Sequence, residues 1–210
     1  MVTLFYTNIL SLYNSEKWDS YFNQIPKQEQ DTILENIRIK EKLQKLGGRL
    51  LLMHVMSMHT NLTLNDISYT PLGKPYIHNA FQFSIAHSGE YVVLAMGDHF
   101  PIGVDIEIIK DIEPTKYYSL LNQHEINELE KTNSSLTLFY TYWVIKESIS
   151  KATGLGLNFN FKEIKIISEK EALIGTKQWY LEKVEIEKNY ICFISTPEKM
   201  TNLIVQRIHL

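Results

Sequence analysis

The chain has 210 residues, of which 44% are hydrophobic and 21% are charged, and its formal net charge is −3. This length suits one large domain or two small ones, and the composition excludes disordered, collagen-like and low-complexity chains. The slightly acidic balance argues against nucleic-acid binding as the main task, because that task usually leaves a basic excess.

The single cysteine, Cys192, lies in an apolar run and excludes an internal disulfide, so we expect a core residue in a reducing compartment. No stretch approaches the roughly 20 apolar residues of a membrane-spanning helix. Residues 1–6 lack the basic leader of a secretory signal. These features predict a cytoplasmic protein that does not contact a membrane.

The chain begins with a predicted strand followed by helices. Apolar alternation predicts a strand over residues 3–9, and a short helix is expected over 16–22. A long helical pattern begins after Pro26 and runs from residue 27 to about 59. Its expected buried face follows the spacing of an amphipathic helix and consists of Ile39, Leu43, Leu46, Leu50 and Met53.

Two glycines, Gly47 and Gly48, lie inside this long helix. Each glycine costs about 1 kcal/mol relative to alanine in a helix. We therefore expect the helix either to lie with its backbone close to another element there or to bend.

Short strands are predicted after residue 67. The segment 69–77 contains two prolines and a glycine and is expected to be a loop. Apolar runs over 81–86 and 91–96 predict two strands joined by a tight turn at 88–90, and a further strand is expected over 102–108.

The rest of the chain repeats this order of elements. Residues 114–131 are compatible with a helix, and Ser134 or Ser135 is expected to cap a second long helix that ends at Gly154. Strands are then expected over 161–167, 178–185, 189–195 and 202–209. The repeat predicts an α+β fold of two similar halves, which we divide into residues 1–101 and 102–210.

Two carboxylates lie on the predicted strand over 102–108. Side chains alternate along a strand, so Asp105 and Glu107 share one face while Val104 and Ile106 are buried on the other. Neighbouring carboxylates repel unless a positive charge lies between them, and Mg²⁺ is a natural neutralising ion. The alternative is an amphipathic edge strand with a solvated acidic face.

The second long helix carries Glu147 and Lys151 four residues apart, on one face. One interpretation is a surface ion pair worth about 0.3–0.5 kcal/mol. In the other interpretation, Glu147 is a metal ligand or a base and Lys151 binds a phosphate oxygen. Phosphate transfer needs such groups because the charge that develops must be neutralised.

His87 follows a predicted strand and either binds a phosphate or caps a loop. The histidines show no zinc pattern: His54 and His59 are five residues apart, whereas a zinc helix has histidines four residues apart.

In this order, the segments 83–88, 103–107 and 143–154 resemble the 4′-phosphopantetheinyl transferase superfamily in its larger, internally duplicated (Sfp-type) branch. The resemblance implies two halves related by a pseudo-two-fold arrangement, each a long helix packed on a small, mostly antiparallel sheet. It also implies transfer of the phosphopantetheine arm of coenzyme A to a serine of an acyl, peptidyl or polyketide carrier protein, with release of 3′,5′-ADP. The implied cofactor is Mg²⁺, with Mn²⁺ as a substitute, and the implied state is a monomer with its active site between the halves.

The resemblance assigns roles to individual residues. It implies that the metal ligands are Asp105, Glu107 and Glu147 and that the catalytic residues are Glu147, as the base, and Lys151. The coenzyme A contacts that it implies are Lys45, Arg49, Gly73, Lys74, Pro75, His87, Ser88 and Lys151. Ser84 and Ala86 stand where the family usually has Asn and Ser. The missing Ser hydroxyl leaves backbone amides as the alternative donors to the phosphate.

Basic residues recur along the first long helix at Arg38, Lys42, Lys45 and Arg49. Such a stripe is either a solvated surface or a site for coenzyme A phosphates or an acidic carrier protein. A non-catalytic module that binds coenzyme A or a carrier protein is the alternative function. A glycoside hydrolase with paired carboxylates is a further alternative, but it would need neither Lys151 nor a metal.

Overall fold

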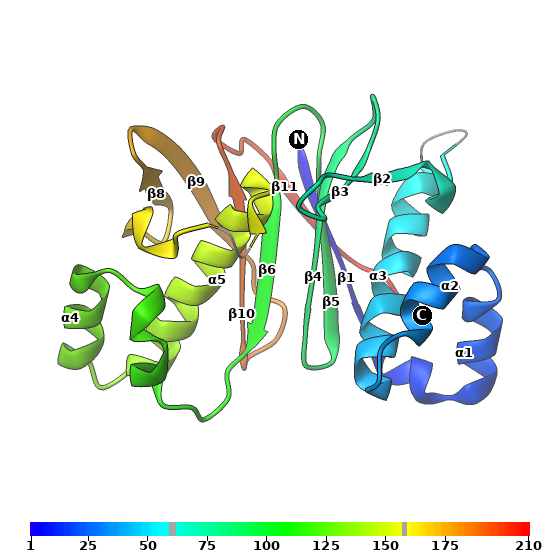
Figure 1. The fold of residues 1–210 in the computed structure, drawn as a ribbon, viewed down its shortest axis with the longest axis horizontal. Helices are drawn as coiled ribbons and strands as arrows, with labels where there is room; N and C mark the ends of the chain where they lie inside the picture. The colour runs from blue at the N-terminus through cyan, green and yellow to red at the C-terminus, as the bar shows by residue number, and fades with distance from the viewer. Residues whose placement is uncertain (59–61, 157–158) are drawn as a thin grey trace.

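The computed structural model describes residues 1–58, 62–156 and 159–210. Two sheets lie at the centre of the molecule, with one group of helices on each outer side (Figure 1). The elements of the first half are β1 (Val2–Asn8), α1 (Ser15–Phe22), α2 (Lys27–Leu34), α3 (Ile39–Ser57), β2 (Ile67–Tyr69), β3 (Pro75–Ile77), β4 (Gln82–Ser88) and β5 (Tyr91–Gly97). Those that follow are β6 (Gly103–Ile108), α4 (Gln123–Lys131), α5 (Ser135–Thr153), β7 (Ile164–Ser168), β8 (Glu171–Ile174), β9 (Lys177–Lys183), β10 (Tyr190–Thr196) and β11 (Leu203–Arg207).

The two sheets repeat one topology. In the order β11-β1-β5-β4, strand β1 pairs antiparallel with β5, and β5 with β4. In the order β6-β10-β9-β8-β7, strand β6 pairs antiparallel with β10, and β10 with β9. Helices α3 and α5 have 19 residues each and follow the first strand of their halves. The α+β fold of two similar halves is therefore confirmed.

The last strand crosses between the halves. Strand β11 lies parallel to β1, with Val2 opposite Leu203 and Tyr6 opposite Arg207. Strand β11, which was expected in the second half, thus extends the sheet of the first half. A division after residue 101 assigns β11 to the other half. An apolar cluster that includes Ala86, Val104 and Cys192 fills the space between the sheets, as expected for a cysteine in the core.

The single helix expected over 27–59 is wrong, because the structure has α2 and α3 with a break at residues 35–38. The side-chain amide of Asn36 donates to the carbonyl oxygens of Thr32 and Ile33, at 3.1 and 3.0 Å. These bonds satisfy carbonyls that a continuing helix would have used. Ile39 consequently lies at the start of α3 and is 66% exposed, not buried as expected. Residue 59, the expected end, lies outside the described residues.

The glycines of α3 confirm the expected close approach. A Cβ atom at Gly47 would lie 3.0 Å from Cγ2 of Ile9, and one at Gly48 would lie 3.3 Å from Cγ2 of Ile85. Within the described residues, no helix combines the length and the apolar character needed to cross a membrane.

The segment expected as a loop over 69–77 is a hairpin instead, in which β2 pairs with β3. Its turn is closed by a 2.8 Å hydrogen bond from the Gly73 amide to the Thr70 carbonyl, and Gly73 has φ = +83°. This left-handed conformation suits glycine, and the turn carries Lys74 toward the second half.

Candidate functional site

The site begins where β6 meets α5. A Cβ atom at Gly103 would overlap the Ser148 carbonyl oxygen, so only glycine lets the strand lie this close to the helix. Two residues further along β6, Asp105 is buried, and its Oδ1 lies 2.7 Å from Nζ of Lys151. Burial raises the pKa of Asp105, and the Lys151 ammonium opposes that rise. Among the residues that the structure describes, the second carboxylate oxygen, Oδ2, is buried and has no hydrogen-bond partner.

Two glutamates lie near this pair, Glu107 two residues further along β6 and Glu147 one turn before Lys151 on α5. The Ser88 hydroxyl donates to Oε2 of Glu107 at 2.6 Å. Burial raises the pKa of Glu107, while the bond from Ser88 lowers it. Burial also raises the pKa of Glu147 to about 7, with further contributions from the negative charges of Asp105 and Glu107. The three carboxylates therefore influence one another's ionisation.

This arrangement fits a cation in its chemistry, since a buried carboxylate oxygen of Asp105 lacks a partner and two further carboxylates lie nearby. Within the described residues, however, no group of three or more ligating side chains is arranged to hold a metal ion. The three-carboxylate metal site stays a prediction.

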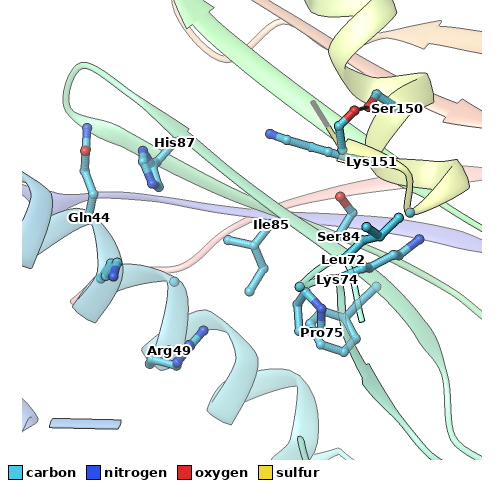
Figure 2. Close-up of a pocket in the computed structure, with 16 residues that line it drawn as sticks. Gln44, Arg49, Leu72, Lys74, Pro75, Ser84, Ile85, His87, Ser150 and Lys151 are labelled. Carbon is cyan, nitrogen blue, oxygen red and sulfur yellow. Dashed lines mark hydrogen bonds between the residues drawn. The ribbon is translucent and has the colours of Figure 1, made fainter. Parts of the chain in front are cut away.

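A cavity of about 340 Å³ opens next to Lys151, between the two halves (Figure 2). In Figure 2, Gln44 and Arg49 extend from α3 on one side, and Lys151 and Lys74 lie on the other. Most of the expected coenzyme A contacts line this cavity: Lys45, Arg49, Gly73, Lys74, Pro75, His87 and Lys151. The structure thus brings together residues that are more than 100 positions apart in the sequence.

The cavity wall is basic. Burial lowers the pKa of Lys74 to about 8, and its Nζ donates to the Ala152 carbonyl at 2.9 Å. The ring of His87 keeps a solvent-exposed surface, yet partial burial lowers its pKa, and the charges of Lys151 and Lys45 lower it further. A neutral imidazole among ammonium groups can donate one hydrogen bond to an anion.

Arg49 already has an anionic partner, which the sequence did not reveal. Its Nε lies 2.5 Å from Oε2 of Glu29, and its Nη2 donates to the Tyr69 hydroxyl at 3.2 Å. Glu29 is on α2 and is buried. No sequence signal marks it, because the contact depends on the break between α2 and α3.

The basic stripe divides along α3. Lys45 and Arg49 reach the cavity, whereas Arg38 is 82% exposed in its side chain and pairs with Glu41 at 3.4 Å. Only the C-terminal part of the stripe therefore belongs to the site.

The structure explains the two residues that differ from the usual residues of the family, Ser84 and Ala86, and the position of Ser88. Ser84 Oγ accepts a hydrogen bond from the Val104 amide at 3.1 Å. Ala86 is 2% exposed and packs between the sheets, where a serine hydroxyl would be among apolar side chains. Ser88, expected to contact coenzyme A, lies outside the lining of the cavity, and its hydroxyl is bonded to Glu107.

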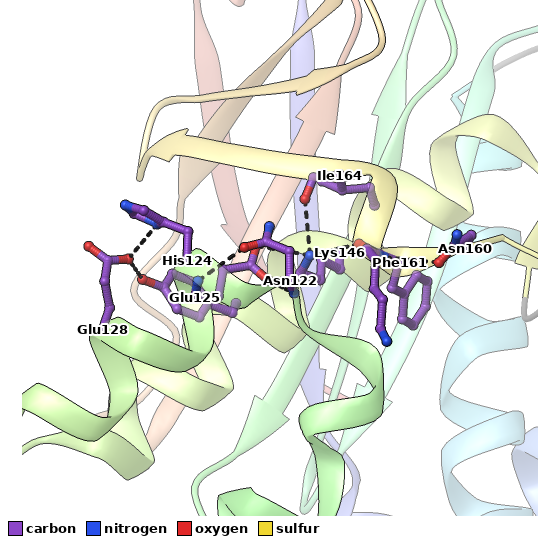
Figure 3. Close-up of polar contacts among 10 residues, drawn as sticks. Asn122, His124, Glu125, Glu128, Lys146, Asn160, Phe161 and Ile164 are labelled. Carbon is purple, nitrogen blue, oxygen red and sulfur yellow. Dashed lines mark hydrogen bonds and ion pairs between the residues drawn. The ribbon is translucent and has the colours of Figure 1, made fainter.

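A buried lysine, Lys146, anchors α5 and is not among the residues expected from the sequence (Figure 3). Its Nζ lies 2.9 Å from Oε1 of Glu125 on α4 and donates to the carbonyls of Phe161 and Ile164 at 2.7 and 3.0 Å. Burial lowers its pKa, and the Glu125 charge opposes this. The one sequence feature that could have identified it is its place directly before Glu147, inside the motif over 143–154.

Comparisons with known proteins agree across both halves. A family model described as the 4′-phosphopantetheinyl transferase superfamily matches residues 101–195, and one described as the N-terminal part of 4′-phosphopantetheinyl transferase matches residues 13–99. The 4′-phosphopantetheinyl transferase gsp of Aneurinibacillus migulanus is 25% identical, over 99% of this chain and 92% of that protein.

Other relatives align over shorter parts. The L-aminoadipate-semialdehyde dehydrogenase-phosphopantetheinyl transferase of Xenopus laevis is 30% identical over 57% of this chain, which spans 46% of that relative's length. The crystal structure of holo-[acyl-carrier-protein] synthase from Thermotoga maritima aligns with a TM-score of 0.39 and 13% identity. That alignment covers 46% of this chain and 62% of the other.

Proposed function

Because the chain belongs to the 4′-phosphopantetheinyl transferase superfamily, in its larger, internally duplicated branch, we propose that it transfers the phosphopantetheine arm of coenzyme A to a serine of a carrier protein. The remaining product is 3′,5′-ADP. One observation carries this proposal for the site itself: Lys151 both lines the basic cavity and lies 2.7 Å from the buried carboxylate of Asp105. A phosphate bound in the cavity would therefore lie next to the carboxylate centre.

We assign the cavity to coenzyme A. Its phosphates would be bound by Lys45, Arg49, Lys74 and Lys151, with His87 as a hydrogen-bond donor, and the turn at Gly73 and Pro75 would lie against the adenosine. Arg49 would share its guanidinium between Glu29 and the ligand, since it has more donors than Glu29 and Tyr69 use.

Glu147 is the proposed base. A pKa of about 7 leaves a substantial part of Glu147 ionised at neutral pH and able to take the proton of the carrier serine, directly or through water. The serine oxygen then forms a bond to the phosphorus that carries the pantetheine arm, and the bond from that phosphorus to the bridging oxygen of the pyrophosphate breaks. The electron pair leaves with 3′,5′-ADP, and Lys151 stabilises the charge that develops.

We further propose that Asp105, Glu107 and Glu147 hold Mg²⁺, for which Mn²⁺ can substitute. The support is the unpartnered, buried Oδ2 of Asp105 beside two other carboxylates. When bound, the ion would supply positive charge to the pyrophosphate. A single chain contributes both walls of the cavity, which supports a monomer. We propose that this monomer works in the cytoplasm with carrier proteins.

The experiment is a panel of apo-carrier proteins from acyl, peptidyl and polyketide systems, each incubated with the full chain, coenzyme A and Mg²⁺. Intact-mass spectrometry is expected to show a gain equal to the phosphopantetheine arm in at least one carrier. No gain across the panel, with enzyme that is folded by circular dichroism, would overturn the proposal. Binding of coenzyme A without any gain would favour a non-catalytic binding module.

A further inference from the structure

The two sheets meet at β4 and β6, which lie side by side in the centre of the molecule but belong to different sheets (Figure 1). Serine hydroxyls bridge them. Ser84 Oγ accepts from the Val104 amide, and Ser88 Oγ accepts from the Ile108 amide, both at 3.1 Å. Both serines are buried, at 5% and 6% exposure, so these side chains satisfy amides of β6 that would otherwise lack an acceptor.

The two bridges differ in where the hydroxyl proton goes. A serine hydroxyl has one proton to donate. Because Ser88 Oγ accepts from Ile108, its proton is free for Glu107, and it donates to Oε2 at 2.6 Å. Within the described residues, Ser84 has the bond from Val104 and no bond to a carboxylate. Ser88 therefore fixes the direction of a carboxylate, and Ser84 does not.

Alternation along β4 separates the roles of neighbouring residues. His87 lines the cavity next to Lys151, while Ser88 does not line it and its hydroxyl points toward β6 and Glu107. The end of one strand thus serves the basic cavity with one side chain and the carboxylate centre with the next.

We propose that Ser88 is a positioning residue that orients Glu107 for a divalent cation, and that Ser84 is its structural counterpart without this role. The inference rests on the proposed function, because it takes Glu107 as a ligand. The hydroxyl holds Oε2, so Oε1 would be available to the cation, as hydrogen bonds from surrounding groups commonly orient ligating carboxylates.

Ser84→Ala is the matched control, because it removes a bridge of the same type and length and leaves Glu107 untouched. The test measures Mn²⁺ binding to the full chain without coenzyme A, by isothermal titration calorimetry and by the paramagnetic resonance of free Mn²⁺. We expect Ser88→Ala to weaken Mn²⁺ binding by about tenfold or more, since such outer partners are typically worth 10–100-fold in metal affinity. Ser84→Ala is expected to stay within about twofold of the wild type, and Ser88→Thr, which keeps the hydroxyl, is expected to restore binding.

Both alanine variants should lower the denaturation midpoint, because each leaves one amide of β6 without its acceptor, and Ser88→Ala should lower it more, because it also removes the hydrogen bond to Glu107. Should Ser88→Ala not fold, Ser88→Cys keeps the volume but donates weakly and is expected to show the same loss of Mn²⁺ affinity. Equal Mn²⁺ affinities of the Ser84 and Ser88 variants, or a wild type that does not bind Mn²⁺, would overturn the assignment. Failure of the proposed function would instead appear as no mass gain of carrier protein with wild-type enzyme, whatever the two serine variants bind.

Discussion

Helices α3 and α5 hold corresponding places in the two halves, and each lies close to strands, but the glycines that permit this are placed differently. In the first half they lie in the helix, where a Cβ atom at Gly47 would be 3.0 Å from Ile9. In the second half the glycine lies in the strand, because a Cβ atom at Gly103 would overlap the backbone of α5. Helix α5 therefore needs no glycine on the face that contacts β6, and the residues of that face have side chains.

This difference separates the chemistry of the halves. On α3, the residues next to the glycines, Lys45 and Arg49, line the cavity and form a basic wall. On α5, Lys151 meets Asp105 of the strand directly, and Glu147 lies one turn away. A repeated topology thus yields one half suited to binding an anion and another suited to moving a proton next to it.

The strongest test of this comparison is Gly103→Ala. The added Cβ would overlap the backbone at Ser148 and Ala152, which neither element can relieve by rotating a side chain. We expect a loss of more than about 3 kcal/mol, above the usual range for overpacking. Urea denaturation followed by circular dichroism measures it.

Substitutions at two other glycines provide a comparison for that result. At Gly97, at the end of β5, an added Cβ would have its nearest neighbour at an ordinary 3.5 Å, so Gly97→Ala should cost little. At Gly47 a helix-propensity gain of about 1 kcal/mol offsets part of the overpacking cost, which predicts an intermediate value. Equal effects at Gly103 and Gly97 would contradict the close approach of β6 to α5.

The buried lysine of α5 has no counterpart among the described residues of α3, where the buried polar side chain is Gln44. Lys146→Ala should destabilise the protein by about 3–5 kcal/mol, because it leaves Glu125 buried without its partner. The free energy of unfolding at pH 7 is the measurement.

An exposed pair of the same residue types provides the control. Lys183 lies 3.3 Å from Glu169, and both side chains are largely exposed, so Lys183→Ala is expected to cost no more than about 1 kcal/mol. If Lys146→Ala is as mild, Lys146 does not anchor α5.

The division between a binding half and a catalytic half predicts different kinetic effects for two lysines of the cavity. Lys151→Ala should lower kcat by about 10²–10³-fold, as for other groups that stabilise developing charge. Lys45→Ala should raise the KM for coenzyme A by about tenfold, equivalent to about 1.4 kcal/mol, with little change in kcat. Steady-state transfer to one carrier protein gives both values. If both variants changed kcat and KM in the same way, the proposed division into a binding half and a catalytic half would be contradicted.

The sequence predicted those parts of the fold and site that depend on local pattern. Alternation located β4, β5 and β6 and put Asp105 and Glu107 on one face, and helical spacing put Glu147 beside Lys151. Gly154 ends α5 with φ = +76°, as a glycine at that position should.

What the sequence could not provide depends on contacts between distant segments. The place of β11 beside β1 joins residues about 200 positions apart, and nothing in either strand specifies that partner. Lys146 looks like a solvated helix lysine until α4 and residues 161–164 cover it. The pairing of Arg49 with Glu29 and the direction of the Ser88 hydroxyl are likewise set by neighbours that local pattern does not identify.

A further expected effect concerns the charge of Glu147 in the absence of metal. Its pKa is raised from an ordinary 4.5 to about 7, so the folded state holds the proton more tightly than the unfolded state does. The stabilisation this gives is complete below pH 4.5 and is lost as the pH rises through 7. Glu147→Gln lacks the titration. We therefore expect the Gln variant to be more stable than the wild type at pH 8 and the difference to vanish toward pH 4.5, measured by urea midpoints in chelator.

Divalent cation then separates this titration from a general effect of the substitution. A cation that binds only the folded state adds stability with concentration, and it does so most where the carboxylates are ionised. Mg²⁺ at pH 8 should thus raise the midpoint of the wild type and reduce or reverse its deficit against Glu147→Gln, with a weaker effect on the variant. A stability difference that is the same at every pH would mean that Glu147 is neither buried nor held near the charges of Asp105 and Glu107, and it would contradict a carboxylate centre in the second half.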